Sequence, residues 1–266
     1  MKTWGERFEE WCASLTIDSK EEGIIPLKLN GCQKFFVKEV TEGIDRGIRQ
    51  FVILKGRQLG ITTVSIALDM FWAFQHAGLQ GGLLFQDDST KEKFRETLQR
   101  YHDNLPRRMK VPLKVHNRYQ TAFRNRSDFQ YMVAGVRTSN DALGRAKALN
   151  FLHATECGFY ADQDGLDTLS SSLAEKNPNR LYIFESTANG FNAWYDMWQT
   201  AKTAIRQKAI FIGWWRKEEY SFNPEDPEYR VYWESAAHLS GTEREWVRKI
   251  KQYYDFDITP NQIAWH

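Results

Sequence analysis

The sequence has little of what marks a disulfide-rich, secreted or membrane protein. Its 266 residues include only three cysteines, and Cys12, Cys32 and Cys157 form no CxxC pair. This argues against a disulfide framework or a structural zinc site and favours a reducing compartment. No apolar run approaches the roughly 18 residues of a membrane span, and the first residues lack the apolar core of a secretory signal. We therefore expect a cytosolic protein without membrane contact.

The net charge is also small. It is +2 at pH 7, with 42% hydrophobic and 26% charged residues. No global field indicates a nucleic-acid partner, so any DNA contact has to come from a local patch. The composition is that of an ordered globular protein, and the length allows one large α/β domain plus an appendage.

Apolar, β-rich runs alternate with helical patterns through the middle of the chain. The patterns predict strands at 51–54, 82–85, 149–154, 181–184 and 209–212 and helices at 62–76 and 90–101. Runs such as Phe51–Leu54 lack polar alternation, which is typical of central parallel strands covered on both faces by helices. A shorter, more polar pattern between Lys110 and Val133 predicts a β-hairpin or ribbon inserted before the next core strand. We expect an α/β fold with a mainly parallel sheet.

The composition changes near residue 214. The segment Asn223-Pro-Glu-Asp-Pro227 breaks the chain, and helical patterns follow at 228–238 and 242–254. Proline at both ends of such a segment disfavours a continuous helix. We therefore divide the chain into a core at 1–213 and a small helical subdomain at 214–266.

A glycine loop joins the first core strand to its helix. It reads Lys55-Gly-Arg-Gln-Leu-Gly-Ile-Thr-Thr63, and Gly60 and Thr62 stand where the pattern GxxxxGK[ST] places its second glycine and its Mg²⁺-binding hydroxyl. In a strand, loop and helix of this kind, backbone N–H groups and the positive helix end surround phosphate oxygens. Taken alone, the degenerate pattern also fits a plain strand-to-helix turn.

Two positions of the loop depart from the usual pattern. Lys55 replaces the first glycine, and Ile61 replaces the lysine. Neutralising the phosphates still requires a cation near the β and γ oxygens, which Lys55 at the mouth of the loop or Arg57 within it could supply.

A second strand, beside the first, should end in a carboxylate that polarises the attacking water. The run Leu149–Phe159 provides it, with Glu156 at the carboxyl end, where ligands bind in open parallel sheets. Thr155 takes the place usually held by an aspartate, and its hydroxyl would reach Mg²⁺ through a water. A surface carboxylate at a strand end remains the alternative for Glu156 taken alone. His153 is interpreted as a satisfied core histidine.

The segment Ser186-Thr-Ala-Asn-Gly190 follows the predicted strand at 181–184. It would lie beside Glu156 if the two strands are neighbours, and its hydroxyls could sense the γ-phosphate and pass on its loss to a helix beginning near Phe191. The alternative is a strand-to-helix turn with Asn-Gly chosen for positive φ.

Three segments together resemble the terminase large subunits of tailed bacteriophages. The loop Lys55–Thr63, the run Gly144-Arg-Ala to Phe159 and the segment Phe184-Glu-Ser-Thr-Ala-Asn-Gly190 resemble, in that order, the phosphate loop, acidic strand and coupling motif of that family. Gln33 resembles the adenine-contacting glutamine that precedes the loop, and Ile258–Trp265 resembles the segment leading into the nuclease domain. The resemblance implies a P-loop ATPase core of the RecA-like type, with ATP and Mg²⁺ bound between motor subunits.

The resemblance also implies roles for single residues. Nucleotide binding falls to Gln33, Lys55, Gly56, Arg57, Gln58, Gly60, Ile61, Thr62 and Thr63. Glu156 is the catalytic glutamate, Thr62 and Thr155 serve Mg²⁺, and the coupling residues are Ser186, Thr187 and Asn189. The catalytic arginine is either Arg57, acting in its own subunit, or Arg145, reaching the neighbouring subunit's nucleotide, and the sequence does not choose between them.

For the whole protein, the resemblance implies a motor that moves double-stranded DNA into a procapsid from the host cytoplasm and is not retained in the virion. The expected partners are DNA, a portal protein, a small terminase subunit and further copies of the chain in a ring. Between Lys91 and Arg126, eleven Lys or Arg against three acids give a local net charge of +8, which fits phosphate contact or simply a solvated face.

Two other functions stay open. One is a nucleic-acid-dependent ATPase of the helicase type, and the other is a nucleotide-binding scaffold with little turnover, because Ile61 and Thr155 occupy two usual catalytic positions. No cluster of aspartates with metal-ligand spacing follows residue 220, so nuclease activity is not expected in this chain.

Overall fold

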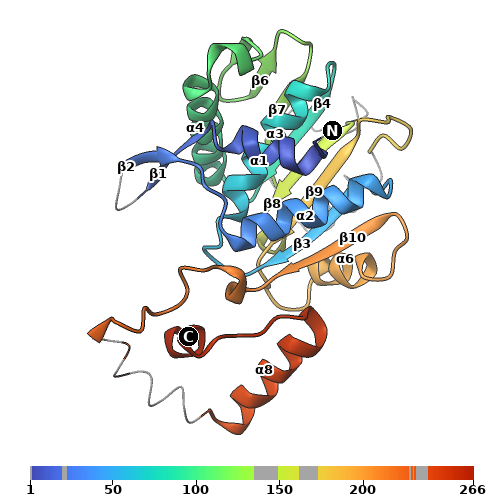
Figure 1. Ribbon diagram of the computed structural model, residues 1–266. Coiled ribbons are helices and arrows are strands. Elements are labelled where there is room, and N and C mark those ends of the chain that lie inside the picture. The colour runs from blue at the N-terminus through green and yellow to red at the C-terminus, as the bar shows by residue number, and fades with distance from the viewer. Residues whose placement is uncertain are drawn as a thin grey trace. The chain divides into compact units, whose positions relative to one another are not determined.

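The computed structural model describes residues 2–19, 23–134, 149–161, 173–227, 229, 231 and 239–266. It divides into two units, Met1–Ile212 and Gly213–His266, drawn in Figure 1. Each unit is described by itself.

The first unit is built around an eight-stranded sheet in the order β10-β3-β9-β8-β4-β7-β6-β5. The strands are β3 (Gln50–Lys55), β4 (Gln80–Phe85), β5 (Leu113–His116), β6 (Gln120–Phe123), β7 (Asp128–Val133), β8 (Phe151–Thr155), β9 (Leu181–Ser186) and β10 (Gln207–Ile212). Pairing is parallel from β10 through to β7, and only β7, β6 and β5 pair antiparallel. The predicted mainly parallel sheet is confirmed.

One expectation about this sheet is wrong. The strand that ends at Glu156 does not lie beside the strand that leads into the glycine loop, because β9 lies between β8 and β3. The expectation that β8 and β9 are neighbours is confirmed, since they pair from Phe151 opposite Leu181 to Thr155 opposite Glu185. Three strand ends therefore meet at one edge of the sheet.

Helices cover the sheet because its central strands are apolar on both faces. Every residue of β8 and β9 is buried, which explains the lack of polar alternation in their sequences. The helices of this unit are α1 (Trp4–Cys12), α2 (Gly31–Asp45), α3 (Ile61–Gln75), α4 (Asp88–Asn104) and α6 (Ala193–Ala201). Helices α1, α2 and α3 contact one another, α4 packs on β4 and β7, and α6 packs on β3 and β10.

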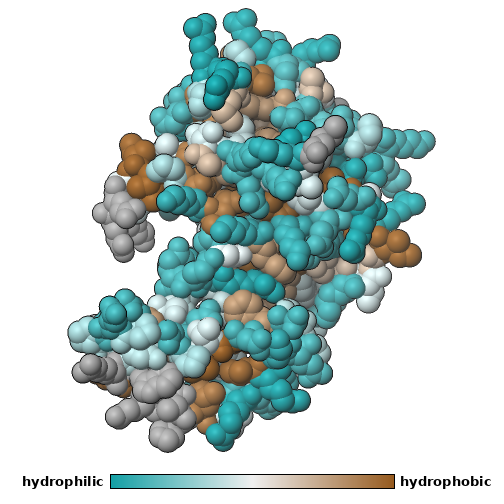
Figure 2. Space-filling view, viewed as in Figure 1, coloured by the Kyte–Doolittle hydropathy of each residue, from teal (hydrophilic) through white to brown (hydrophobic). Residues whose placement is uncertain are grey.

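The face of this unit drawn in Figure 2 is mostly polar. On the face drawn in Figure 2, hydrophilic residues predominate over α2, and hydrophobic residues gather at the antiparallel hairpin of β1 (Thr16–Ser19) and β2 (Gly23–Pro26). Ile24 of this hairpin is 70% exposed. A single exposed aliphatic side chain of this kind is common on protein surfaces.

The second unit is a small helical assembly held by aromatic rings. It contains a short 3₁₀ turn η3 (Trp214–Arg216), α8 (Gly241–Tyr254) and α9 (Pro260–Trp265). Trp265 stacks on Tyr220 with ring centroids 4.1 Å apart and also contacts Trp214. The helix predicted at 242–254 is confirmed as α8, whereas most of 228–238 lies outside the described residues.

No helix in the described parts of the chain is both long and apolar enough to cross a membrane.

Candidate active site

The glycine loop has the backbone that phosphate binding requires. Gly60 has φ +73°, where any other residue would strain the backbone, and a Cβ there would come within 2.7 Å of the Gln33 Nε2 atom and displace it. Helix α3 begins at Ile61 without a side-chain cap. Among the described α-helices, the six others all have a side chain that accepts from a first-turn N–H group. The first turn of α3 therefore presents its N–H groups and positive dipole end to an anion.

Gln33 and Asn30 support this loop from the start of α2. The Gln33 Nε2 atom donates to the Gly60 carbonyl at 2.8 Å, and its Oε1 atom accepts from the Asn30 N–H at 3.0 Å. Asn30 Nδ2 donates to the Leu59 carbonyl at 3.3 Å. Both ends of the Gln33 amide are thus engaged with protein, and in this structure Gln33 positions the loop. The adenine contact expected for it stays a prediction.

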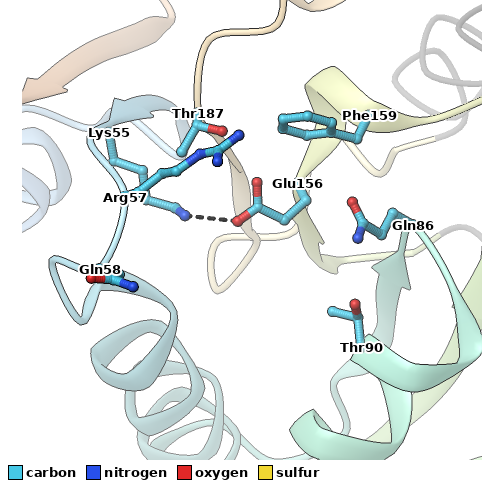
Figure 3. Close-up of a pocket in the computed structure, with 8 residues that line it drawn as sticks. All are labelled: Lys55, Arg57, Gln58, Gln86, Thr90, Glu156, Phe159 and Thr187. Atoms are coloured by element: carbon cyan, nitrogen blue, oxygen red, sulfur yellow. Dashed lines mark hydrogen bonds and ion pairs between the residues drawn. The ribbon is translucent and has the colours of Figure 1, made fainter.

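A cavity of about 460 Å³ opens at the carboxyl ends of four strands, and Figure 3 shows its lining side chains. They come from the loop, from the β4–α4 junction and from the turns after β8 and β9: Lys55, Arg57, Gln58, Gln86, Thr90, Glu156, Phe159 and Thr187. Its volume lies within the usual range of roughly 300–1,000 Å³ for small-molecule sites.

Three of these residues, Gln86, Thr90 and Phe159, were not predicted as site residues from the sequence. A signal for Gln86 existed, because Gln86 directly follows the predicted strand at 82–85 and so ends at the same sheet edge as Glu156. In Figure 3, Gln86 and Thr90 lie across the cavity from the loop.

Lys55 and Glu156 are brought together although 101 positions separate them in the sequence. The Lys55 Nζ atom donates to Glu156 Oε1 at 2.9 Å, and Lys55 is only 8% exposed. Burial lowers the pKa of Lys55, but the carboxylates of Glu185 and Glu156 outweigh it and raise that pKa above its usual value. Lys55 is therefore a charged cation at the floor of the cavity.

Glu156 has an unusual backbone. Its φ is +56°, in the left-handed region, where a residue other than glycine is strained by roughly 1–2 kcal/mol. Such strain persists only where the surrounding structure holds it, and it often occurs at functional positions. Here it turns the Glu156 carboxylate toward Lys55 (Figure 3).

The segment 186–190, which resembles the coupling motif and is called the coupling segment below, is hydrogen-bonded to the turn that follows Glu156. The Ser186 Oγ atom accepts from the Gly158 N–H at 3.0 Å, and Asn189 Nδ2 donates to the Gly158 carbonyl at 2.8 Å. Thr187 lines the cavity. The segment after β9 is therefore hydrogen-bonded to the backbone two residues beyond Glu156.

The residues expected to serve Mg²⁺ fit that ion. Thr62 lies in the first turn of α3, and the Thr155 hydroxyl donates to Glu185 Oε1 at 2.8 Å, which leaves its lone pairs available as acceptors. Within the described residues, no three His, Cys, Asp or Glu gather into a metal-binding group. Mg²⁺ typically binds through one or two protein groups together with phosphate oxygens and waters, and this donor set matches that pattern.

The two candidate arginines differ in what the structure describes. Arg57 is exposed and lines the cavity beside Lys55 and Thr187. Arg145 lies outside the described residues, so the choice between an arginine of the same subunit and one of a neighbouring subunit stays open.

The structure is similar to solved phage proteins. It matches the large terminase ATPase domain of Thermus phage P74-26 with a TM-score of 0.51 and 14% identity, over 77% of this chain and 82% of that one. It matches the large terminase of bacteriophage HK97 with a TM-score of 0.62 and 15% identity, over 100% of this chain and 55% of that one. A third match, the large terminase of a thermophilic bacteriophage, has a TM-score of 0.54 and 13% identity, over 85% and 51% of the two chains.

This chain has the fold of a phage large-terminase ATPase domain. The resemblance inferred from the motifs is confirmed at the level of the fold, and the expected α/β fold class is confirmed with it. The chain spans about half the length of the two complete terminases, 55% and 51%. No protein-family model and no curated protein sequence matches it.

Within this terminase ATPase fold, the loop, the strand ending at Glu156 and the coupling segment occupy one edge of the sheet. Of the site residues inferred from the sequence, five line the cavity, namely Lys55, Arg57, Gln58, Glu156 and Thr187. Gln33 contacts the loop at Gly60, and Arg145 lies outside the described residues.

Proposed function

We propose that this chain is the ATP-hydrolysing motor domain of a DNA-packaging terminase. The observation that carries the proposal is the Lys55–Glu156 pair: a buried cation from the phosphate loop and a carboxylate from the end of β8 meet at 2.9 Å across one cavity. A phosphate-binding cation next to a general base is what hydrolysis of a nucleoside triphosphate requires.

Binding of the triphosphate would use the loop and its two cations. The N–H groups at the start of α3 bind phosphate oxygens, Lys55 neutralises charge from the floor of the cavity, and Arg57 does so from its rim. Thr62 would hold Mg²⁺ directly and Thr155 through a water. When bound, the ion supplies charge neutralisation and polarises the phosphoryl oxygens.

Hydrolysis would then depend on Glu156. Its carboxylate accepts a proton from the attacking water, while Lys55 holds it in place through one of its three N–H donors and keeps the other two for phosphate. After the γ-phosphate leaves, Thr187 loses a contact in the cavity. Ser186 and Asn189 pass the shift to Gly158 and so to the turn after Glu156.

The partner of the motor would be double-stranded DNA, held through its backbone. Three cations of the basic stretch 91–126 form ion pairs within the protein. They are Lys91 with Asp88, Arg95 with Glu92 and Arg100 with Asp18. One exposed cation, Lys93, lies on α4, and the other exposed ones lie after α4 and along β5 and β6: Arg107, Arg108, Lys114, Arg118, Arg124 and Arg126. Exposed cations without base-reading geometry suit a protein that must slide along any sequence.

A portal protein, a small terminase subunit and a ring of further copies complete the proposal for the whole terminase. A nucleotide-binding scaffold is the second candidate function, favoured by Ile61 at the usual lysine position.

The test of the proposal is Glu156→Gln, measured for ATP binding and for ATP hydrolysis. The amide keeps the size of the side chain but cannot accept the proton, so affinity should stay within a few fold while turnover falls by about 10²–10⁴-fold. Glu39→Gln is the matched control, because Glu39 also pairs with a lysine, Lys208, at 3.0 Å, outside the site. Undiminished turnover by Glu156→Gln would remove Glu156 from the mechanism, and binding without turnover in the unmodified protein would favour the scaffold.

A further inference from the structure

A fully buried group of polar side chains adjoins the site and has no part in the mechanism described so far. The His153 Nδ1 atom lies 2.7 Å from Asp69 Oδ2, and its Nε2 atom lies 3.4 Å from Glu185 Oε1. Thr155 Oγ1 donates to the same Glu185 oxygen at 2.8 Å. All four residues are at most 1% exposed.

Glu185 is the central member of this group. Its Oε2 atom is buried and has no hydrogen-bond partner among the described residues. A carboxyl group with one oxygen left without a partner in the protein interior is costly, so a purely structural role explains it poorly.

The position of Glu185 relates it to the residue missing from the acidic strand. Thr155 stands where P-loop ATPases usually carry an aspartate, and in the parallel pairing of β8 with β9 the residue directly opposite Thr155 is Glu185. The carboxylate absent from β8 is thus present one strand away, in direct hydrogen-bond contact with the residue that replaced it.

The hydrogen bond has a direction that matters. Because the Thr155 hydroxyl donates its only hydrogen bond to the Glu185 carboxyl group, its oxygen can act toward any other partner only as an acceptor. A threonine paired in this way can accept a hydrogen bond from a water, as an aspartate would, and has no hydrogen left to donate to that water.

We propose that Thr155 and Glu185 together replace the aspartate of the acidic strand, with Glu185 as a positioning residue that acts through Thr155 on the waters of nucleotide-bound Mg²⁺. This inference rests on the proposed function. His153, held by Asp69 of α3, contacts the same Glu185 oxygen as Thr155 does, so the helix that starts at the glycine loop also anchors this pair.

The experiment measures the affinity of a fluorescent ATP analogue for the purified protein in Mg²⁺ and in EDTA. In the unmodified protein, Mg²⁺ should tighten binding. Glu185→Gln and Thr155→Val should each lose about 10-fold or more of that gain, in the range seen when groups behind a metal's ligands are removed. Affinity in EDTA should be unchanged, and Thr155→Ser, which keeps the hydroxyl, should behave as the unmodified protein.

The decisive variant moves the carboxylate back to β8. The double substitution Thr155→Asp with Glu185→Gln should regain most of the Mg²⁺-dependent affinity lost in Glu185→Gln alone. Thr155→Asp by itself should perturb the site, because it places a second carboxylate directly opposite Glu185. Glu39→Gln, again the control, should leave the Mg²⁺ dependence unchanged.

Thermal unfolding of each variant separates this role from a structural one. If Glu185 serves only as a counter-ion, Glu185→Gln lowers the melting temperature while the folded variant keeps its Mg²⁺ dependence, and the inference is overturned. The same conclusion follows if the double variant fails to recover or if Thr155→Val binds as the unmodified protein does. Failure of the proposed function gives a different result, since the unmodified protein would then either not bind the analogue in Mg²⁺ or bind it without hydrolysing ATP.

Discussion

Two charged regions of the first unit are built in opposite ways. One is the sheet edge proposed to bind nucleotide, called the nucleotide edge here. There, Lys55, His153 and Glu185 are buried, and each contacts an oppositely charged partner. On β5, β6 and the segments beside them, cations such as Arg108, Lys114 and Arg124 are exposed to solvent.

The difference teaches how charge is used in each place. Buried charges interact strongly, are hardly screened by salt, and leave a costly unpaired partner when one is removed. Exposed cations are screened and act additively, each contributing little. Substitutions at the nucleotide edge should therefore have large effects that salt does not change, and substitutions in the basic region should have small effects that salt governs.

The largest effect is expected from Lys55→Ala. It removes a phosphate-binding cation and leaves Glu185 and Glu156 without it, so turnover should fall by about 100-fold or more, and the free energy of unfolding should fall by on the order of 3 kcal/mol. The measurements are steady-state ATPase kinetics and urea unfolding. The control is Lys208→Ala, which should keep turnover. Lys208 lies on β10 and pairs with Glu39 of α2. Normal nucleotide affinity and turnover in Lys55→Ala would shift the phosphate role to Arg57.

A second effect, on stability, follows from His153. Burial lowers the pKa of His153, but Asp69 and Glu185 outweigh it and raise that pKa to about 10. A raised folded-state pKa gives stability that is complete below the unfolded-state value near 6.5 and is lost as pH rises toward 10. The free energy of unfolding should thus fall between pH 7 and 10 by on the order of 2 kcal/mol more in the unmodified protein than in His153→Asn. Parallel pH profiles of the two proteins would contradict this.

These two predictions concern features that the sequence reveals unequally. The strand-and-helix alternation, the loop and Glu156 were predictable because apolar runs and strand-end positions are local signals. Glu185 also follows an apolar run, but no role could be predicted for it. Its contact with Thr155 depends on the β8–β9 register that places the two residues opposite each other. Register between distant strands is not a local property of either sequence.

The N-terminal helices were missed for a related reason. Helices α1 and α2 have capping boxes at Thr3 and Asn30, a signal that the sequence does contain. The Gln33 side chain, expected from the resemblance to contact adenine, closes the Asn30 box and holds Gly60 in this structure. The insertion of β9 between β3 and β8 could not be predicted, because chain order does not fix strand order.

The smallest single effect is expected in the basic region. Arg124→Gln should weaken binding of double-stranded DNA by a few fold at moderate salt and lower the slope of log affinity against log salt by about one, with little dependence on sequence. Lys38→Gln, at an exposed lysine of α2, should leave the slope unchanged. An unchanged slope in Arg124→Gln would remove this surface from the DNA contact, and a loss confined to certain sequences would indicate base reading instead.

The central claim is that the Lys55–Glu156 edge hydrolyses ATP in the service of DNA movement. The most direct test is ATP turnover by the purified protein in Mg²⁺, with and without linear double-stranded DNA, at two salt concentrations. We predict measurable turnover that DNA stimulates, with the stimulation weakening at high salt and the basal rate nearly unchanged, because one region is exposed and the other buried. Absence of turnover under all these conditions, in protein that binds the nucleotide, would contradict the account.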